Sequence, residues 1–259
     1  MELRLPELAG ENLVAFVLVL ARVGGLFVFA PFFSARLIPR QVRLVAAGAL
    51  ALALTPLATG GRPVPDGVAE LVGLVAKEVM VGLSLAFAIG ALGAAIQAAA
   101  GLLDAAIGFS LAAIVDPVTS VQNAILGQFY SLFLVMVLIL TGGDHIMIAG
   151  FAASYEIVPL DAFPSMVTLS SLAVSGFVQV FVIGLEIVAP VLIALIVIDA
   201  AFGLVSRAVP QMNVLFVGLP VKIIAGFVVI GASLPFVAGR LQAELEQAVR
   251  AALQVLGAA

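Results

Sequence analysis

The side chains that could do covalent chemistry in this sequence are few and scattered. There is no Cys and only one His, His145, so a thiolate nucleophile, a disulfide framework and a metal site of Cys or several His are excluded. Ser110 follows Gly108-Phe109 but lacks the second Gly of a nucleophile elbow. The Asp residues that could form a catalytic pair are Asp104, Asp116, Asp144 and Asp199, and no spacing brings two of them together. The sequence therefore predicts no catalytic, cofactor-binding or metal site, and an intramembrane hydrolase using Ser110 or two Asp remains an alternative.

A second set of candidates is charged and lies inside or beside long apolar stretches. It comprises Arg22, Lys77, Glu78, Glu186 and Lys222. An ionisable group at membrane depth costs at least ~2.5 kcal/mol unless it faces protein or water, so such residues are candidates for function. The alternative is structural, with the charges in interhelical ion pairs, for example Arg22 with Glu186. We favour the structural interpretation because the paired carboxylates of a proton relay are missing.

The composition explains why these charges stand out. Hydrophobic residues make up 64% of the 259 residues and charged residues 10%, against roughly 25% charged in ordinary soluble proteins. So few charges cannot cover the surface of a free soluble monomer, and so many apolar residues exclude disorder. The net charge of -4, with scattered basic residues, argues against nucleic acid as a partner. The sequence predicts a membrane protein.

The apolar stretches predict an all-α chain of membrane helices in a single domain. A span needs about 20 apolar residues, and six stretches approach this length: residues 12–33, 44–58, 79–103, 117–143, 162–198 and 208–239. We expect the second to close at Thr55-Pro56, and the helix of the fourth to begin near Gln122. The fifth is too long for one span, which predicts a bend or break near Gly184, Glu186 and Pro190.

Two periodic patterns add detail to the predicted helices. Small residues recur every four positions and predict a helix face for close packing: Gly82, Ala86, Gly90, Ala94 and Ala98. After Gly239, charged residues interleave with an apolar row and predict an amphipathic tail helix. That row is Leu241, Leu245, Val249 and Leu253.

The stretch from Asp104 to Pro117 is the most unusual. Eleven uncharged, mostly apolar residues between Asp104 and Asp116 are too few to span a bilayer, and a residue before Pro avoids helical backbone. Irregular apolar backbone at membrane depth is tolerated where it is buried in protein or lines a cavity. The stretch therefore predicts a re-entrant or occluding loop, and a buried connection between helices is the alternative.

Two sequence blocks resemble one known family. The first begins Gly108-Phe-Ser-Leu-Ala-Ala-Ile-Val-Asp116-Pro117 and continues with Leu126-Gly127 and Gly143-Asp144-His145. The second contains Pro210, Gln211, Asn213, Gly218, Pro220 and Lys222. Both resemble the FliR family of flagellar type III export gate proteins, whose injectisome counterpart is SctT, and the likeness covers nearly the whole chain.

The resemblance implies a function. FliR-like proteins assemble with FliP-like and FliQ-like subunits, with a FlhB-like subunit as a further partner, into the portal that passes unfolded export substrates. By this likeness the chain lies among membrane lipid in the bacterial inner membrane, in the flagellar basal body. Residues 1–200 would be FliP-like, with a plug loop near residues 106–122, and residues 201–259 would be a FliQ-like hairpin with the tail helix.

The resemblance also assigns the pore plug. Its residues would be Ile107, Gly108, Phe109, Ser110, Leu111, Ala112, Ala113, Ile114, Val115, Asp116 and Pro117. Apolar side chains there would close the lumen by excluding water, and Gly108 would let the loop move aside. The alternative function is a small-solute transporter or channel with its site at a bent helix around Glu186 and Pro190, because broken helices line such sites.

Overall fold

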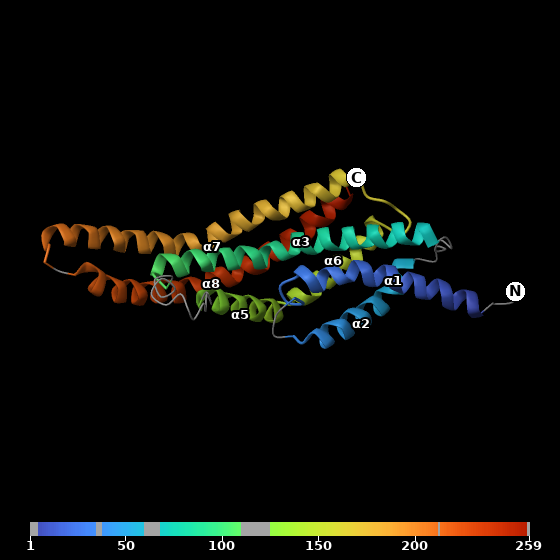
Figure 1. Ribbon diagram of the computed structural model, residues 1–259, viewed down its shortest axis with the longest axis horizontal. Helices are drawn as coiled ribbons and strands as arrows, with labels where there is room; N and C mark the ends of the chain where they lie inside the picture. The colour runs from blue at the N-terminus through green and yellow to red at the C-terminus, as the bar shows by residue number, and fades with distance from the viewer. Residues whose placement is uncertain (1–4, 35–37, 60–67, 110–124, 212, 258–259) are drawn as a thin grey trace. The chain divides into compact units, whose positions relative to one another are not determined.

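The computed structural model describes residues 5–34, 38–59, 68–109, 125–211 and 213–257. These residues form long helices joined by short connections, and no strand occurs among them (Figure 1). The helices are α1 (Leu5–Phe29), α2 (Arg40–Thr59), α3 (Val68–Ile107), α5 (Ile125–Leu140), α6 (Gly143–Ile157), α7 (Met166–Ala208) and α8 (Val214–Gly257). The predicted all-α fold is confirmed.

The chain divides into two compact units. Unit 1 comprises Met1–Ala91, Leu138–Val178 and Glu244–Ala259, and unit 2 comprises Leu92–Val137 and Gln179–Ala243. Helices α3, α7 and α8 each contribute residues to both units.

Unit 1 is organised around an apolar core between α1, α2, the first half of α3 and α6. Helix α1 packs along α2, and α2 also contacts α6. The core contains Leu18, Val19, Val23, Ala51, Leu54, Ala58, Leu74, Tyr155 and Leu160. The predicted apolar face of the tail helix lies in the same unit from Glu244 onward, and there Leu245 and Val249 are buried. A Cβ on Gly150 of α6 would meet the Val249 side chain at 2.6 Å, so α6 and α8 approach closely.

Unit 2 consists of the second half of α3, most of α5 and the hairpin of α7 and α8. Figure 1 shows the two arms of the hairpin running antiparallel to its closed end. Apolar side chains from all four helices fill the interior, among them Ile96, Leu126, Leu195 and Ile230. A Cβ on Gly184 of α7 would lie 3.1 Å from the Ala95 carbonyl oxygen of α3, which shows how closely the two backbones pack.

Helices α2 and α7 each continue through a Pro at which the sequence suggested an end, a bend or a break. Helix α2 continues through Pro56 to Thr59, and the Thr55 hydroxyl donates to the Ala51 carbonyl one turn earlier. Helix α7 is unbroken through Pro190, so the predicted break does not occur and the bend stays a prediction. The tail after Gly239 is helical, as predicted, and it continues α8 to Gly257. Long stretches of neighbouring helix outweigh the local preference of a single Pro or Gly.

Several helices are long and apolar enough to cross a membrane. Five meet this description by length and composition, and the count rises to six if the bent pair α5 and α6 is one span. Helix α7 has 43 residues, about twice the ~20 that a span requires. The described chain is an all-α membrane protein with several apolar helices.

Candidate functional site

A buried charged cluster joins α1, α3 and the end of α6 within unit 1. Arg22 donates from Nε to Glu78 Oε2 at 2.5 Å and from Nη2 to Glu78 Oε1 at 3.0 Å. It also donates to the Ser154 carbonyl and hydroxyl at 3.1 and 3.2 Å, and to the Val158 carbonyl at 2.8 Å. Its guanidinium carbon lies 4.1 Å from the centroid of the Tyr155 ring. Arg22 thus makes five hydrogen bonds, which matches its five N–H donors.

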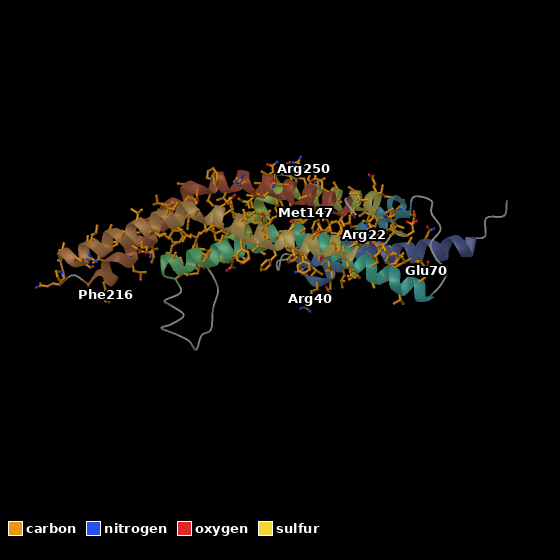
Figure 2. The ribbon with its side chains drawn as sticks, turned by 90° about the horizontal axis from the view of Figure 1, so that it is seen from above. Arg22, Arg40, Glu70, Met147, Phe216 and Arg250 are labelled. Carbon is orange, nitrogen blue, oxygen red and sulfur yellow. The ribbon has the colours of Figure 1, made fainter. Side chains whose placement is uncertain are left out.

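Lys77 completes the charged cluster from the neighbouring position on α3. Its Nζ lies 2.5 Å from Glu78 Oε1 and donates to the carbonyls of Pro159 at 3.2 Å and Leu160 at 2.9 Å. The Arg22 and Glu78 side chains are 0% exposed and that of Lys77 is 3% exposed. Figure 2 shows Arg22 among the packed side chains of unit 1, whereas Arg40, Glu70 and Arg250 stand on its exposed surface. The cluster fastens the segment between α6 and α7 to the core, which is a structural task.

The remaining charged candidates form their own pairs in unit 2. Glu186 of α7 accepts a hydrogen bond from Arg240 of α8, and Lys222 of α8 donates to Asp199 of α7 at 2.7 Å. The predicted pairing of Arg22 with Glu186 is therefore wrong. The residues around Arg22 and around Glu186 carry no signal for their partners, because the tertiary fold decides which helices are neighbours.

The stripe of small residues on α3 has two environments. Gly82 is buried in unit 1, and a Cβ there would overlap the backbone of Arg22. Gly90 is half-buried, and its Cβ would lie 2.5 Å from the Phe29 carbonyl oxygen; Ala86 between them is fully buried. The last two members, Ala94 and Ala98, belong to unit 2 and are exposed. In unit 1 the stripe lets the α1 and α3 backbones touch.

The second sequence block closes the α7–α8 hairpin. Pro210 and Gln211 form the exposed turn. Asn213 lies immediately before α8 and caps it, because its side-chain oxygen accepts the Phe216 N–H at 3.4 Å. Gly218 faces the Phe202 ring of α7, where a Cβ would lie 3.5 Å from the ring. Figure 2 labels Phe216, which lies in the first turn of α8 at this end of the hairpin.

Two further members of the block lie inside α8. Pro220 stands exposed in its second turn, and Lys222 makes the ion pair with Asp199. Asn213, Gly218 and Lys222 thus make local contacts within the hairpin.

The predicted plug begins at the end of α3. Ile107, the first residue of the predicted plug, is the last residue of this helix and is completely buried. Gly108 has φ 105°, a left-handed conformation that favours glycine. The N–H groups of Gly108 and Phe109 both donate to the Asp104 carbonyl, at 3.3 and 3.0 Å. This is a Schellman-type helix end. The remaining plug residues, 110–117, and the predicted helix start at Gln122 lie outside the described residues.

The side chain of Asp104 makes a second link at the same place. Its Oδ1 accepts the backbone N–H of Leu126, in the first turn of α5, at 3.1 Å. The first N–H groups of a helix have no partner within the helix, and a carboxylate there also interacts favourably with the helix dipole. One residue thus terminates α3 through its carbonyl and caps α5 through its carboxylate. Sequence reasoning considered Asp104 only as a catalytic acid, although Gly108 four residues later is a signal for a helix end.

In the described part of the chain, the Asp residues considered for catalysis each contact a different partner. Asp144 and His145 contact each other at 3.2 Å at the start of α6, where the His145 side chain is 87% exposed. Asp199 is engaged by Lys222, and Asp104 by Leu126. Within residues that the structure describes, no three His, Asp or Glu side chains are grouped as metal ligands. Ser110 and Asp116 lie outside that part.

Long apolar helices, internally paired charges and an apolar hairpin define an all-α membrane protein. Comparison with known proteins narrows this class, because the family described as "Bacterial export proteins, family 1" matches residues 13–248. The chain belongs to this family. The resemblance to FliR proteins is confirmed.

Similar proteins include flagellar and non-flagellar members. The "Flagellar biosynthetic protein FliR" of Bacillus subtilis is 33% identical over 83% of this chain and 84% of its own length. That of Caulobacter vibrioides is 30% identical over 85% of this chain and 88% of its own. The "Surface presentation of antigens protein SpaR" of Shigella flexneri is 28% identical, over 82% and 83%.

Proposed function

We propose that this chain is a core subunit of the flagellar type III protein export gate, which helps to form and plug the pore for unfolded export substrates. The observation that carries the proposal is the family match over residues 13–248. The two most similar relatives reported above are both named as flagellar biosynthetic proteins. Such a subunit resides in the bacterial inner membrane, within the flagellar basal body.

The proposed partners are FliP-like and FliQ-like subunits and a FlhB-like subunit, together with unfolded substrates and membrane lipid. The proposal is supported by the apolar surface of unit 2, where many large side chains are more than half exposed in the single chain. They include Leu185, Ile193, Ile196 and Val197 of α7 and Ile224, Val228 and Phe236 of α8. An apolar surface of this extent is typical of contact with lipid or with other subunits.

The proposed plug comprises residues 107–117, named the plug below. Its apolar side chains, such as Phe109, Leu111 and Ile114, exclude water from the lumen and thereby block ions. We further propose that residues 1–200 are the FliP-like part and residues 201–259 the FliQ-like hairpin with its tail. The task is mechanical, and the chain acts without catalysing a reaction.

The alternative is a small-solute transporter or channel with its site at a bent helix around Glu186 and Pro190. Helix α7 continues without a break through both residues, which argues against a broken-helix site. Glu186 is paired with Arg240 at the surface of unit 2, with both side chains more than 40% exposed. The buried charges of unit 1 are bonded to each other and to backbone carbonyls. A transported solute would have to displace these partners.

Purification tests the assembly. The tagged chain, extracted in mild detergent from its native membrane, is expected to carry FliP-like and FliQ-like subunits with it, identified by mass spectrometry. A chain that purifies as a stable homo-oligomer without these subunits and moves a small solute would overturn the proposal.

Deletion tests the plug in the assembled complex. Removing residues 109–115 is expected to increase ion leakage through the membrane, because the apolar closure is lost. A variant with Ala94 and Ala98, both exposed, changed to Ser serves as a control for general perturbation. Unchanged leakage and unchanged export after the deletion would contradict the assignment of the plug.

A further inference from the structure

The end of α3 and the start of α5 are held together by contacts that the function proposed above does not explain. Asp104 belongs to the last turn of α3, and Leu126 to the first turn of α5. They are 22 residues apart in sequence, yet the Asp104 carboxylate accepts the Leu126 N–H at 3.1 Å. The last turn of α3 and the first turn of α5 are therefore in direct contact within unit 2.

Asp104 is placed for this task by burial. The residue is 7% exposed, and its second carboxylate oxygen, Oδ2, is buried without a hydrogen-bond partner. Burying a carboxylate oxygen without a hydrogen-bond partner costs free energy. The packing of the surrounding helices offsets this cost. Among the described residues of unit 2, Asp104 is the only buried charged residue, and it contributes an acceptor oxygen there.

Helix α8 supplies the second contact at this place. The Phe109 ring lies 6.1 Å, centroid to centroid, from the Phe227 ring. One residue earlier on α8, a Cβ on Gly226 would meet the Ile107 side chain at 2.9 Å. The absence of a side chain at Gly226 thus lets α8 approach Ile107, and Phe227 receives Phe109.

We propose that Asp104 and Phe227 are positioning residues that anchor the root of the plug, residues 107–109, at the place where α3, α5 and α8 contact each other. Asp104 fixes where α3 ends and where α5 begins, and Phe227 holds the first apolar ring of the plug against α8. This inference depends on the proposed plug function, because anchoring matters only if the plug closes a pore. The role belongs to side chains outside residues 107–117, which the sequence did not single out for it.

Rescue by a conservative variant tests the Asp104 role. In the assembled complex, Asp104→Ala is expected to increase ion leakage by at least about fivefold, a shift of the size that loss of a helix cap produces. Asp104→Asn keeps an acceptor oxygen for the Leu126 N–H and is expected to stay near the wild-type leakage. Equal leakage of Asp104→Ala and wild type, or of Asp104→Asn and Asp104→Ala, would overturn the role.

A cross-linking readout separates anchoring from general loss of packing. The chain has no Cys of its own, so Cys replacing Phe109 and Phe227 can be joined by a short bifunctional thiol reagent and identified by mass spectrometry of this chain's peptides. Asp104→Ala is expected to lower the yield of this cross-link. A control pair replaces Gln97 and Ser131, which are hydrogen-bonded between α3 and α5 in the same unit; its yield is expected to stay constant. Equal losses in both pairs would mean that Asp104 only supports the unit.

The Phe227 contact keeps the inference testable if Asp104→Ala prevents assembly. Phe227→Ala is expected to raise leakage, whereas Phe216→Ala, an exposed ring in the first turn of the same helix, is expected to leave it unchanged. If deletion of residues 109–115 causes leakage but neither Phe227→Ala nor Asp104→Ala does, the anchor is wrong and the plug stands. If the deletion itself causes none, the proposed function fails, independently of the cross-link result.

Discussion

Arg22 and Glu78 form a two-point ion pair inside unit 1, with both side chains completely buried. The pair joins α1 to α3, and Lys77 shares the same carboxylate. Two cations therefore depend on one anion, and the remaining donors of both cations are used on Ser154 and on carbonyls between residues 154 and 160. Removing Glu78 therefore affects both cations, whereas removing one cation leaves the other paired with Glu78.

Glu78→Gln is expected to destabilise the complex more than Arg22→Gln. Losing Glu78 leaves two buried cations without the carboxylate that both contact, whereas losing Arg22 leaves the Lys77–Glu78 pair intact. Breaking a buried pair costs about 3–5 kcal/mol. Thermal unfolding of the detergent-solubilised complex measures the difference. The exposed pair Arg250–Glu246 is the control, and Arg250→Gln is expected to change stability by less than about 0.5 kcal/mol.

Gly25→Ala is expected to destabilise the protein, and Gly24→Ala is not. A Cβ on Gly25 would overlap the Gly82 backbone of α3, whereas a Cβ on Gly24 has no atom within 4 Å. Overpacking costs about 1–3 kcal/mol, and replacing an unconstrained helical Gly by Ala gains up to about 1 kcal/mol. The two adjacent variants are compared by thermal unfolding. Equal stability of both would contradict direct contact between the α1 and α3 backbones.

Gly108→Ala is expected to lower stability because any other residue is strained at φ 105°. A residue with a Cβ in this conformation loses about 1–2 kcal/mol. Gly101 provides the comparison on the same helix, since it has open space around its Cα and helical backbone. Gly101→Ala is expected to be neutral or slightly stabilising. Denaturant titration followed by circular dichroism measures both, and an unaffected Gly108→Ala would argue against the helix end described above.

Glu186→Gln is expected to leave substrate export within about twofold of wild type. The ion pair with Arg240 has both side chains more than 40% exposed, and such pairs contribute about 0–1 kcal/mol. Secretion of an export substrate into the medium is the measurement. A complete loss of export, with the complex still assembled, would revive a functional site at this position of α7.

Helix content and membrane class could be predicted from the sequence, because long runs of apolar residues are visible in consecutive positions of the chain. The ends of the helices were harder to predict from the sequence. Pro56 and Pro190 read as breaks, yet both lie inside helices. A single Pro removes one hydrogen bond and is tolerated where packing on either side holds the helix.

The partners of the charges could not be predicted in the same way. Arg22, Lys77, Glu78, Glu186 and Lys222 were found as a set because charge in an apolar stretch is visible locally. Their pairing depends on which helices touch, and residues 56 positions apart, Arg22 and Glu78, have no local signal for each other. The role of Asp104 was missed for the same reason, since Leu126 is remote in sequence and donates only through its backbone.

By itself, the sequence determined that this is an all-α membrane protein of the bacterial export family, because hydropathy and the two motif blocks are written in consecutive residues. Only the tertiary structure decided that Arg22 pairs with Glu78, that the α1 and α3 backbones touch at Gly82, and that Asp104 caps α5. The physical reason is that burial, hydrogen bonding and close packing depend on distance in space, and these partners come from separate helices.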